Sequence, residues 1–357
     1  MLLLMESSGD RWGRTNQLMD HLEEKDVHAE EWSWYEAQIV DFLQKELNLA
    51  SRFSTDDIKH AIGLLNVNAV CLQFPKMIGC PSTEVGKGCY PIFAIMSHHC
   101  ICNARYFVDP NTFNMYVRAR VGVKAGEELT VQYLSALNGT HRRRAKIREE
   151  WYFDCSCKRC SDPTECGSYI SALKCMSCYV GSLLPSNPLD YTSTWTCVKC
   201  GSEVDHDKVD CIVDYIENEL NQITNSSDFQ KYKDFIAEYS GTILHPNHFL
   251  LTTARRNLMQ YFCYSTPDNH RTEGQELQFR VGLCKSFYDV LHKIDPGWSE
   301  LGMFGQRELH FTRLSLLQRD FALGTVPFAE FSVKSRDSIQ VLKKIDEQKK
   351  IITFKRE

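Results

Sequence analysis

The spacing of apolar residues divides the chain into a helical beginning, a β-rich middle and a helical end. Before residue 66, apolar side chains recur at helical intervals, most clearly from Glu31 to Leu47. The expected buried face of that stretch is Trp32, Tyr35, Ile39, Phe42, Leu43 and Leu47. Ser54 followed by Asp57 predicts the start of another helix at this point, since the pair matches a capping box.

The pattern changes to strands and turns between residues 86 and 134. From Met115 to Val121, apolar residues alternate with aromatic or charged ones, which predicts a strand with its apolar side buried. A turn at 124–126 leads to a second predicted strand at 129–133, and residues 66–70 predict the entry into β structure.

Helices are predicted again in the rest of the chain. A basic helix is expected from Gly139 to Glu150, with Arg142, Arg143 and Arg144 on a solvated face. After Val204 the predicted helices, packed as antiparallel pairs, are 206–223, 227–238, 246–263, 275–292, 298–319 and 327–347.

Composition narrows the class of protein. The chain has 357 residues, of which 43% are hydrophobic and 24% charged, the balance of a globular protein. A net charge of −5 gives no indication of direct nucleic-acid binding, and no apolar run is long enough for a membrane span. The apolar start Met1–Met5 is too short for a signal peptide, so we expect a protein of the nucleus and/or cytoplasm. There, the 16 cysteines favour metal binding over disulfides.

The strongest chemical signal is a pair of Cys-x-x-Cys motifs. Cys175 and Cys178 are followed, after a short insert, by Cys197 and Cys200, a spacing typical of one tetrahedral structural zinc. Gly181 and Gly201 come just after the two motifs, where we expect tight turns that need glycine.

A second cysteine set is incomplete by spacing alone. Cys155, Cys157 and Cys160 supply three thiolates, and a tetrahedral zinc site needs a fourth ligand. The spacing leaves several candidates open: Cys166 nearby in sequence, and His98, His99, Cys100 and Cys102 further away.

These motifs together resemble the SET-and-MYND (SMYD) family of SET-domain proteins, in particular its arthropod branch. Residues 152–160, Y-F-D-C-S-C-K-R-C, are similar to the family's post-SET motif. Residues 126–133, G-E-E-L-T-V-Q-Y, match its G-E-E-[ILV]-T-x-x-Y segment, and residues 97–103, S-H-H-C-I-C-N, align with N-H-S-C-x-P-N. The resemblance extends over most of the chain.

The resemblance implies a set of site residues. Cys100 would complete the zinc site of Cys155, Cys157 and Cys160, giving two structural zinc ions in all. Tyr133 would be the catalytic tyrosine that orients a lysine amine. The expected contacts to S-adenosyl-L-methionine are His98, Asn103, Asn68, Phe153 and Ser97, where Ser97 replaces the asparagine of the motif with a shorter side chain.

The resemblance also implies an α+β fold with four regions. These are a helical SET insert at 1–66, a partial SET core at 67–150, a post-SET and second zinc region at 151–203, and a tetratricopeptide-like helical domain at 204–357. No G-x-G turn precedes residue 67 and no MYND knuckle is found, so we expect the sequence to begin inside the helical insert, as in a truncated isoform.

Two functions follow as hypotheses. One is an S-adenosylmethionine-dependent protein-lysine methyltransferase acting on histone or other proteins. The other is a catalytically inactive SET-family interaction protein or transcriptional corepressor scaffold, whose helical end binds a partner peptide.

Overall fold

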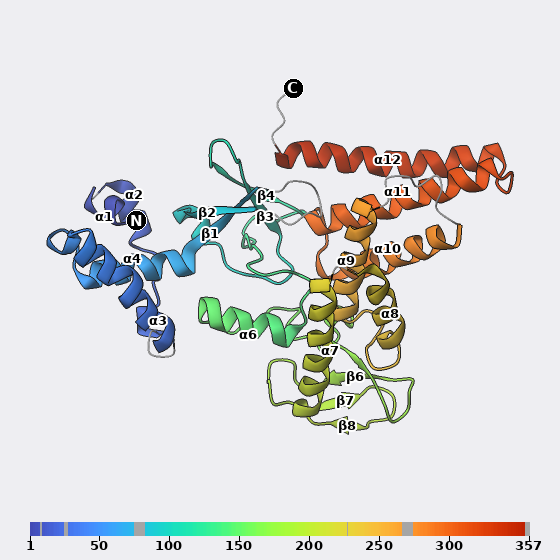
Figure 1. Cartoon of the computed structure of the whole chain (residues 1–357), viewed down its shortest axis with the longest axis horizontal. Helices are drawn as coiled ribbons and strands as arrows, with labels where there is room; N and C mark the ends of the chain where they lie inside the picture. Colours follow the sequence, from blue (N-terminus) through green and yellow to red (C-terminus); the bar gives the residue numbers. More distant parts are fainter. Residues whose placement is uncertain (8, 25–27, 75–82, 227, 266–273, 354–357) are drawn as a thin grey trace. The chain divides into compact units, whose positions relative to one another are not determined.

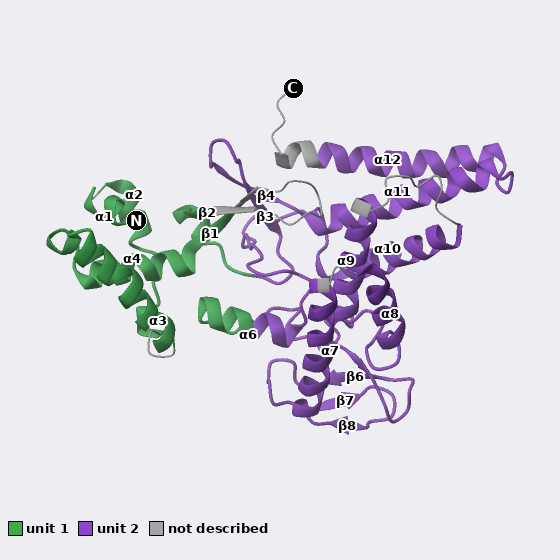
Figure 2. Cartoon of the chain, in the orientation of Figure 1, with its two compact units in different colours: residues 1–75, 82–98, 145–154 green, residues 76–81, 99–144, 155–357 purple. Residues whose placement is uncertain are grey.

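The computed structural model describes residues 1–7, 9–24, 28–74, 83–226, 228–265 and 274–353 (Figure 1). The fold is α+β, as the sequence predicts, with small antiparallel sheets among many helices. The chain forms two compact units, shown in Figure 2: unit 1 has residues 1–75, 82–98 and 145–154, and unit 2 has residues 76–81, 99–144 and 155–357. The division into four regions stays a prediction.

Unit 1 is a small helical body with one hairpin. Its elements are α1 (Leu2–Glu6), α2 (Asp10–Thr15), η1 (Leu22–Glu24), α3 (Ala29–Tyr35), η2 (Glu36–Val40), η3 (Phe42–Glu46), η4 (Leu49–Ser51), α4 (Thr55–Asn68), β1 (Ala69–Phe74), β2 (Thr83–Cys89) and α5 (Pro91–Ala94). Strand β1 pairs antiparallel with β2. The buried core of the helices is Trp32, Val40, Phe53, Ile58 and Ile62.

Two local predictions in unit 1 have different outcomes. The capping box is confirmed, because the Ser54 hydroxyl accepts from the Asp57 N–H and the Asp57 carboxylate accepts from the Ser54 N–H. The predicted helical face from Glu31 to Leu47 is wrong at its end, where Phe42 and Leu47 are exposed. The helix there continues as the π-helical turns η2 and η3, whose wider spacing rotates later residues away from the core.

In unit 2, β3 (Ala104–Val108) and β4 (Met115–Ala119) form an antiparallel hairpin with Phe107 opposite Tyr116. The strand is where the sequence predicts it, but the prediction that its apolar side is buried is wrong. Val117 and Val121 are exposed, whereas Arg120, from the opposite side of the alternation, is buried. An ion pair decides this orientation, because Arg120 contacts the buried Asp295 at 2.6 Å.

The predicted strand at 129–133 is not a regular strand. Two backbone bonds connect it to the motif at 97–103 and its continuation: the His99 N–H donates to the Val131 carbonyl and the Ala104 N–H to the Thr130 carbonyl. Between them the Asn103 side chain accepts from the Thr130 N–H at 2.9 Å. The Asn103 side chain thus accepts a backbone hydrogen bond that a carbonyl of a neighbouring strand would accept in a regular sheet.

Helix α6 (Thr140–Trp151) is the predicted basic helix, and the boundary between the two units falls within it. A four-stranded antiparallel sheet of order β5-β6-β7-β8 follows, made of β5 (Leu173–Lys174), β6 (Ser182–Pro185), β7 (Trp195–Cys197) and β8 (Glu203–Val204).

The six helices predicted after Val204 are all present. They are α7 (His206–Ser226), α8 (Phe229–Tyr239), α9 (Phe249–Ser265), α10 (Gly274–Ile294), α11 (Glu300–Ala322) and α12 (Phe328–Thr353). From α8 to α12 each helix packs on the next, a succession visible in Figure 1. The core is shared with the small sheet, since Leu183 and Trp195 belong to the same buried cluster as Ile216 and Phe235. No helix in the described part of the chain has the length and apolarity to cross a membrane.

Candidate metal centres and catalytic segment

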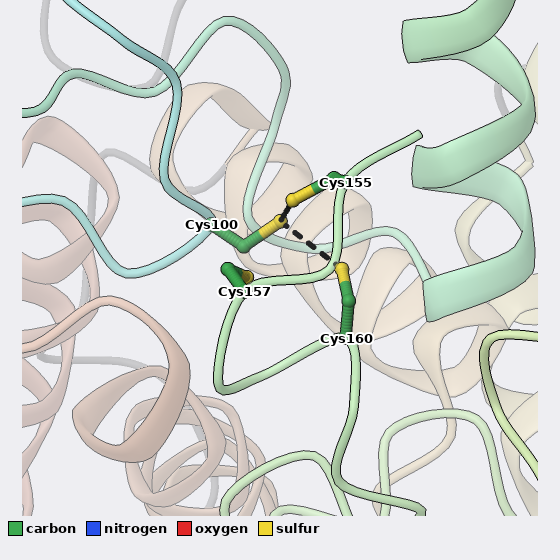
Figure 3. A group of neighbouring side chains, drawn as sticks. All are labelled: Cys100, Cys155, Cys157 and Cys160. Atoms are coloured by element: carbon green, nitrogen blue, oxygen red, sulfur yellow. Dashed lines mark hydrogen bonds between the residues drawn. The ribbon is translucent and has the colours of Figure 1, made fainter. Parts of the chain in front are cut away.

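Unit 2 brings Cys100 together with Cys155, Cys157 and Cys160 (Figure 3). All four sulfur atoms lie within 4.8 Å of one another, and Cys100 Sγ is 3.5 Å from Cys160 Sγ. Of the fourth ligands that spacing left open, the structure therefore selects Cys100. Cys102 has another role, since its sulfur accepts from Arg120 Nη1 at 3.4 Å.

A buried arginine of α6 lies against this tetrad. Arg143 donates from Nε to Cys100 Sγ at 3.3 Å and from Nη2 to Cys160 Sγ at 3.5 Å. The expectation of a solvated face is wrong for Arg143 and Arg144, which are buried, and holds only for the neighbouring Arg142. Four thiolates around one Zn²⁺ carry excess negative charge, and a guanidinium on two of the sulfurs compensates part of it.

Glu165 connects this arginine to a second one. Its Oε2 accepts from Arg143 at 2.8 Å and from Arg159 at 2.9 Å, with all three side chains buried. Burial by itself raises the pKa of Glu165, but the two guanidinium groups outweigh it and hold that pKa at about 2. No pattern in the sequence indicates this buried network, because a basic helix normally faces water.

The second tetrad consists of Cys175, Cys178, Cys197 and Cys200, again with all sulfurs within 4.8 Å. Cys175 Sγ lies 3.7 Å from Cys200 Sγ, and Cys178 Sγ lies 3.8 Å from Cys197 Sγ. Backbone N–H groups of Val180 and Gly181 favour the thiolate of Cys178 and lower its pKa to about 6. Such N–H to sulfur bonds prepare a thiolate for metal binding.

The two glycines after these motifs serve different purposes. Gly201 has the expected left-handed backbone, with φ of 72°. Gly181 is required for space instead, because a Cβ there would lie 2.3 Å from Cys197 Sγ. In each of the two clusters four cysteine thiols converge, and at the second one the backbone of Gly181 lies close to a sulfur. Four cysteine sulfurs are the donor set of closed structural zinc sites. Both clusters thus fit zinc.

Tyr133 and Asn103 lie in unit 2. Tyr133 is half-buried, and burial raises the pKa of its phenol, so the hydroxyl is neutral at physiological pH. Asn103 uses its amide within the protein: Nδ2 donates to the Glu128 carbonyl at 2.8 Å, and Oδ1 accepts from the Thr130 N–H. The observed role of Asn103 is therefore to fix the segment that leads to Tyr133.

Asn68, Ser97, His98 and Phe153 lie in unit 1. The rings of His98 and Phe153 are 6.3 Å apart, so the structure brings these two together. Ser97 is exposed. Asn68 donates to the carbonyls of Met19 and Leu64, which leaves only its side-chain oxygen for a further contact. The assignment of these residues to a cofactor stays a prediction.

A buried ion cluster supports the segment before Tyr133. Asp295 contacts Arg105 at 2.8 Å and Arg120 at 2.6 Å, and the Asp295 side chain has no exposed surface. Arg105 also donates to Gln132 Oε1 at 3.0 Å, and Gln132 donates to the Cys100 carbonyl at 3.1 Å. Through these contacts the loop between α10 and α11, which holds Asp295, is linked to Gln132 beside Tyr133 and to Cys100 of the first tetrad.

Comparison with known proteins agrees with these motifs. The SET domain-containing protein SmydA-8, isoform A, of Drosophila melanogaster is 27% identical over 267 residues, which cover 74% of this chain and 56% of the relative. This similarity supports a SET-domain protein of the SET-and-MYND family. Other SET-and-MYND relatives match shorter parts. Mouse histone-lysine N-methyltransferase Smyd1 is 27% identical over 41% of this chain and 31% of its own length. Human histone-lysine N-methyltransferase SMYD3 is 37% identical over 33% of this chain and 26% of its own length.

No family model matches the sequence. The chain spans about half the length of SmydA-8, because the matched region covers 56% of isoform A and 47% of isoform B.

Proposed function

We propose that this chain carries the catalytic tyrosine, two structural zinc sites and the helical domain of a SET-type protein-lysine methyltransferase. The similarity to SET-and-MYND proteins named histone-lysine N-methyltransferases carries the proposal. By family analogy we extend it to a protein substrate, with histone as one candidate, and to the nucleus and/or cytoplasm.

Tyr133 is the proposed catalytic residue. S-adenosylmethionine supplies the methyl group when bound, and His98 and Phe153 are the proposed residues that contact it. The Tyr133 hydroxyl stays protonated because burial raises its pKa. A neutral phenol can hydrogen-bond a lysine amine and hold it in line, which lowers the entropic part of the barrier. Asn103 and Gln132 position that tyrosine through the hydrogen bonds described above, which their side chains make to backbone groups of unit 2.

The two zinc ions are assigned structural roles in this proposal. Each tetrad is closed by four cysteines, so neither leaves a position for a reactive water. The first tetrad joins Cys100, which lies within the motif at 97–103, to the cysteines that follow α6. Zinc there ties the post-SET segment to the segment before Tyr133, so its removal should unfold this part of unit 2.

A second candidate function is an inactive SET-family scaffold. Ser97 favours it, because serine replaces the asparagine of the motif and reaches less far. The internally satisfied amide of Asn103 favours it too. In this case the helices α7 to α12 would bind the partner peptide.

Titration calorimetry of the zinc-loaded chain with S-adenosylmethionine separates the two candidates. Micromolar binding, followed by methyl transfer to histone proteins that Tyr133→Phe abolishes without weakening cofactor binding, supports the enzyme. A folded, zinc-replete chain that does not bind the cofactor overturns the enzyme proposal for this chain and favours the scaffold.

A further inference from the structure

The two cysteine tetrads differ in how well the fold covers them. Three cysteines of the first tetrad are buried and its fourth, Cys157, is half-buried. In the second tetrad two are buried, Cys178 is half-buried and Cys200 is exposed. Among these eight cysteines, all within the described residues, Cys200 alone is exposed. A small molecule dissolved in water therefore reaches the second tetrad at Cys200.

The two glycines of the second tetrad show which of its sides is open. An added Cβ at Gly181 would meet the sulfur atoms of Cys197 and Cys178, so the backbone covers that side. Gly201, directly after Cys200, is different, because no atom of the described residues beyond its chain neighbours lies within 4 Å of an added Cβ. The chain leaves space beside Cys200 that it does not leave beside Cys197.

The first tetrad has a protection that adds to its burial. Arg143 donates to the sulfur atoms of Cys100 and Cys160, and its side chain has no exposed surface. A hydrogen bond from a guanidinium stabilises the charge on a thiolate and makes that sulfur a weaker nucleophile. The first tetrad should therefore react more slowly with an oxidant than the second.

Cys200 also has a partner for oxidation. Cysteines that bind zinc are thiolates, and an accessible thiolate is the form that peroxides oxidise. Cys175 Sγ lies 3.7 Å from Cys200 Sγ. A disulfide bond is about 2 Å long, so the two sulfur atoms need to approach by less than their present separation, within loops that already hold them together.

We propose that Cys200 is a redox-sensitive modification site: hydrogen peroxide oxidises it, a disulfide with Cys175 forms, and the second tetrad releases its zinc while the first retains its own. This inference is independent of the methyltransferase proposal, because it concerns the cysteines and the fold rather than Tyr133.

The reaction balances with peroxide as the oxidant. The Cys200 thiolate attacks one peroxide oxygen, the O–O bond breaks, and a sulfenic acid and a hydroxide ion form. The Cys175 thiolate then attacks the sulfenic sulfur, the S–O bond breaks, and a second hydroxide ion leaves. The two thiolates lose two electrons and the peroxide gains them. Zn²⁺ does not change its oxidation state, but it is left with two of its four thiolates and dissociates.

Release of this zinc should affect the helical part of unit 2. Cys197 belongs to β7, and Trp195 of the same strand packs in one buried cluster with Ile216 of α7 and Phe235 of α8. The Cys175–Cys200 disulfide would still join the two motifs across the small sheet. Because that link preserves the pairing of the motifs, a thiol reductant and fresh zinc should restore the original state.

The test follows zinc release from the zinc-loaded full chain. Hydrogen peroxide is added in the presence of a chromophoric chelator, and a sample without peroxide gives the baseline. We expect one zinc ion per chain to be released well before the other. Peptide mapping by mass spectrometry should then find the Cys175–Cys200 disulfide, and dithiothreitol with added zinc should return the chain to two ions.

Two variants make the test specific. Cys200→His replaces the exposed thiolate by a ligand that zinc also accepts and that forms no disulfide, so release should slow by about tenfold or more. Cys211→Ser is the matched control, because Cys211 is exposed on α7 and lies outside both tetrads. It should release zinc at the rate of the natural protein.

Several results would overturn the proposal. They are a chain that retains both ions in peroxide, release of both ions at the same rate, and release that Cys200→His does not slow. If Cys200→His binds only one ion, mapping of the natural protein decides the question. A Cys175–Cys200 disulfide beside an unmodified first tetrad supports the proposal, and oxidation that begins at the first tetrad or at Cys211 contradicts it.

Discussion

Arg143 Nε lies 3.3 Å from Cys100 Sγ, so a buried guanidinium from α6 donates directly to a cysteine of the first tetrad. The same side chain contacts Glu165, which links the metal cluster to a buried ion network. The first tetrad therefore lies beside a buried network of two arginines and one glutamate, which carries a net positive charge.

Replacing Arg143 by methionine should weaken both zinc binding at this tetrad and the stability of unit 2. The change leaves Glu165 with one arginine in a buried site, and breaking such a pair costs about 3–5 kcal/mol. Urea unfolding and competition with a chromophoric chelator measure the two effects. Arg142→Met is the control, because its exposed pairs with Asp214 and Glu217 contribute only about 0–1 kcal/mol. Equal effects of the two substitutions would contradict the role of Arg143.

Gly181→Ala should release zinc from the second tetrad and leave the first intact. The new Cβ would lie 2.3 Å from Cys197 Sγ, so the sulfur has to move out of the tetrad. Native mass spectrometry should show one zinc per chain in place of two. Gly13→Ala tests the specificity of the effect, because no atom lies within 4 Å of its added Cβ. If Gly181→Ala retained both ions, the close approach would not matter for metal binding.

His248 should make the protein less stable in mildly acidic solution. Burial lowers the pKa of His248 to about 3, with a small opposing effect from Glu165 and a further lowering from His245. An unfolded chain binds a proton on this histidine near pH 6.5 and the folded protein does not, so stability is kept above that pH and lost as the pH falls through it. The loss is about 1.4 kcal/mol per pH unit, or about 2 kcal/mol at pH 5.

His248→Asn removes this titration, so its urea midpoint should fall less than that of the natural protein between pH 7.5 and pH 5. Asparagine can still accept the Leu250 N–H that His248 Nδ1 accepts at 3.3 Å. Both proteins need excess zinc throughout, which cancels the metal contribution in the comparison. Parallel curves for the two proteins would rule out His248 as the cause.

Asp295→Asn should destabilise unit 2 by about 3–5 kcal/mol, the usual effect of removing one partner of a buried ion pair. It leaves Arg105 and Arg120 facing each other without the carboxylate that neutralises them. Chemical denaturation measures the change. Asp289→Asn, which affects only an exposed pair with Lys285, should change stability by about 1 kcal/mol at most. A stable Asp295→Asn protein would show that the two arginines are solvated or paired in another way.

Local spacing determined much of this protein. The six terminal helices, the basic helix at α6 and the capping box at Ser54 all form where the sequence predicts them, because periodicity and caps act over a few neighbouring residues. The tetrad formed by the two Cys-x-x-Cys motifs is predictable for the same reason, since each motif positions its two thiolates within one turn.

Tertiary contacts decided the rest. Spacing could not choose Cys100 over Cys102 as the fourth tetrad cysteine, and no local pattern shows that Arg120 is buried against Asp295, far along the chain. An alternating strand pattern or a run of basic residues predicts a solvent-exposed side correctly only when its charged side chains have no ion-pair partner elsewhere in the fold. A partner distant in sequence makes burial of a charge favourable, and only the folded chain brings that partner close.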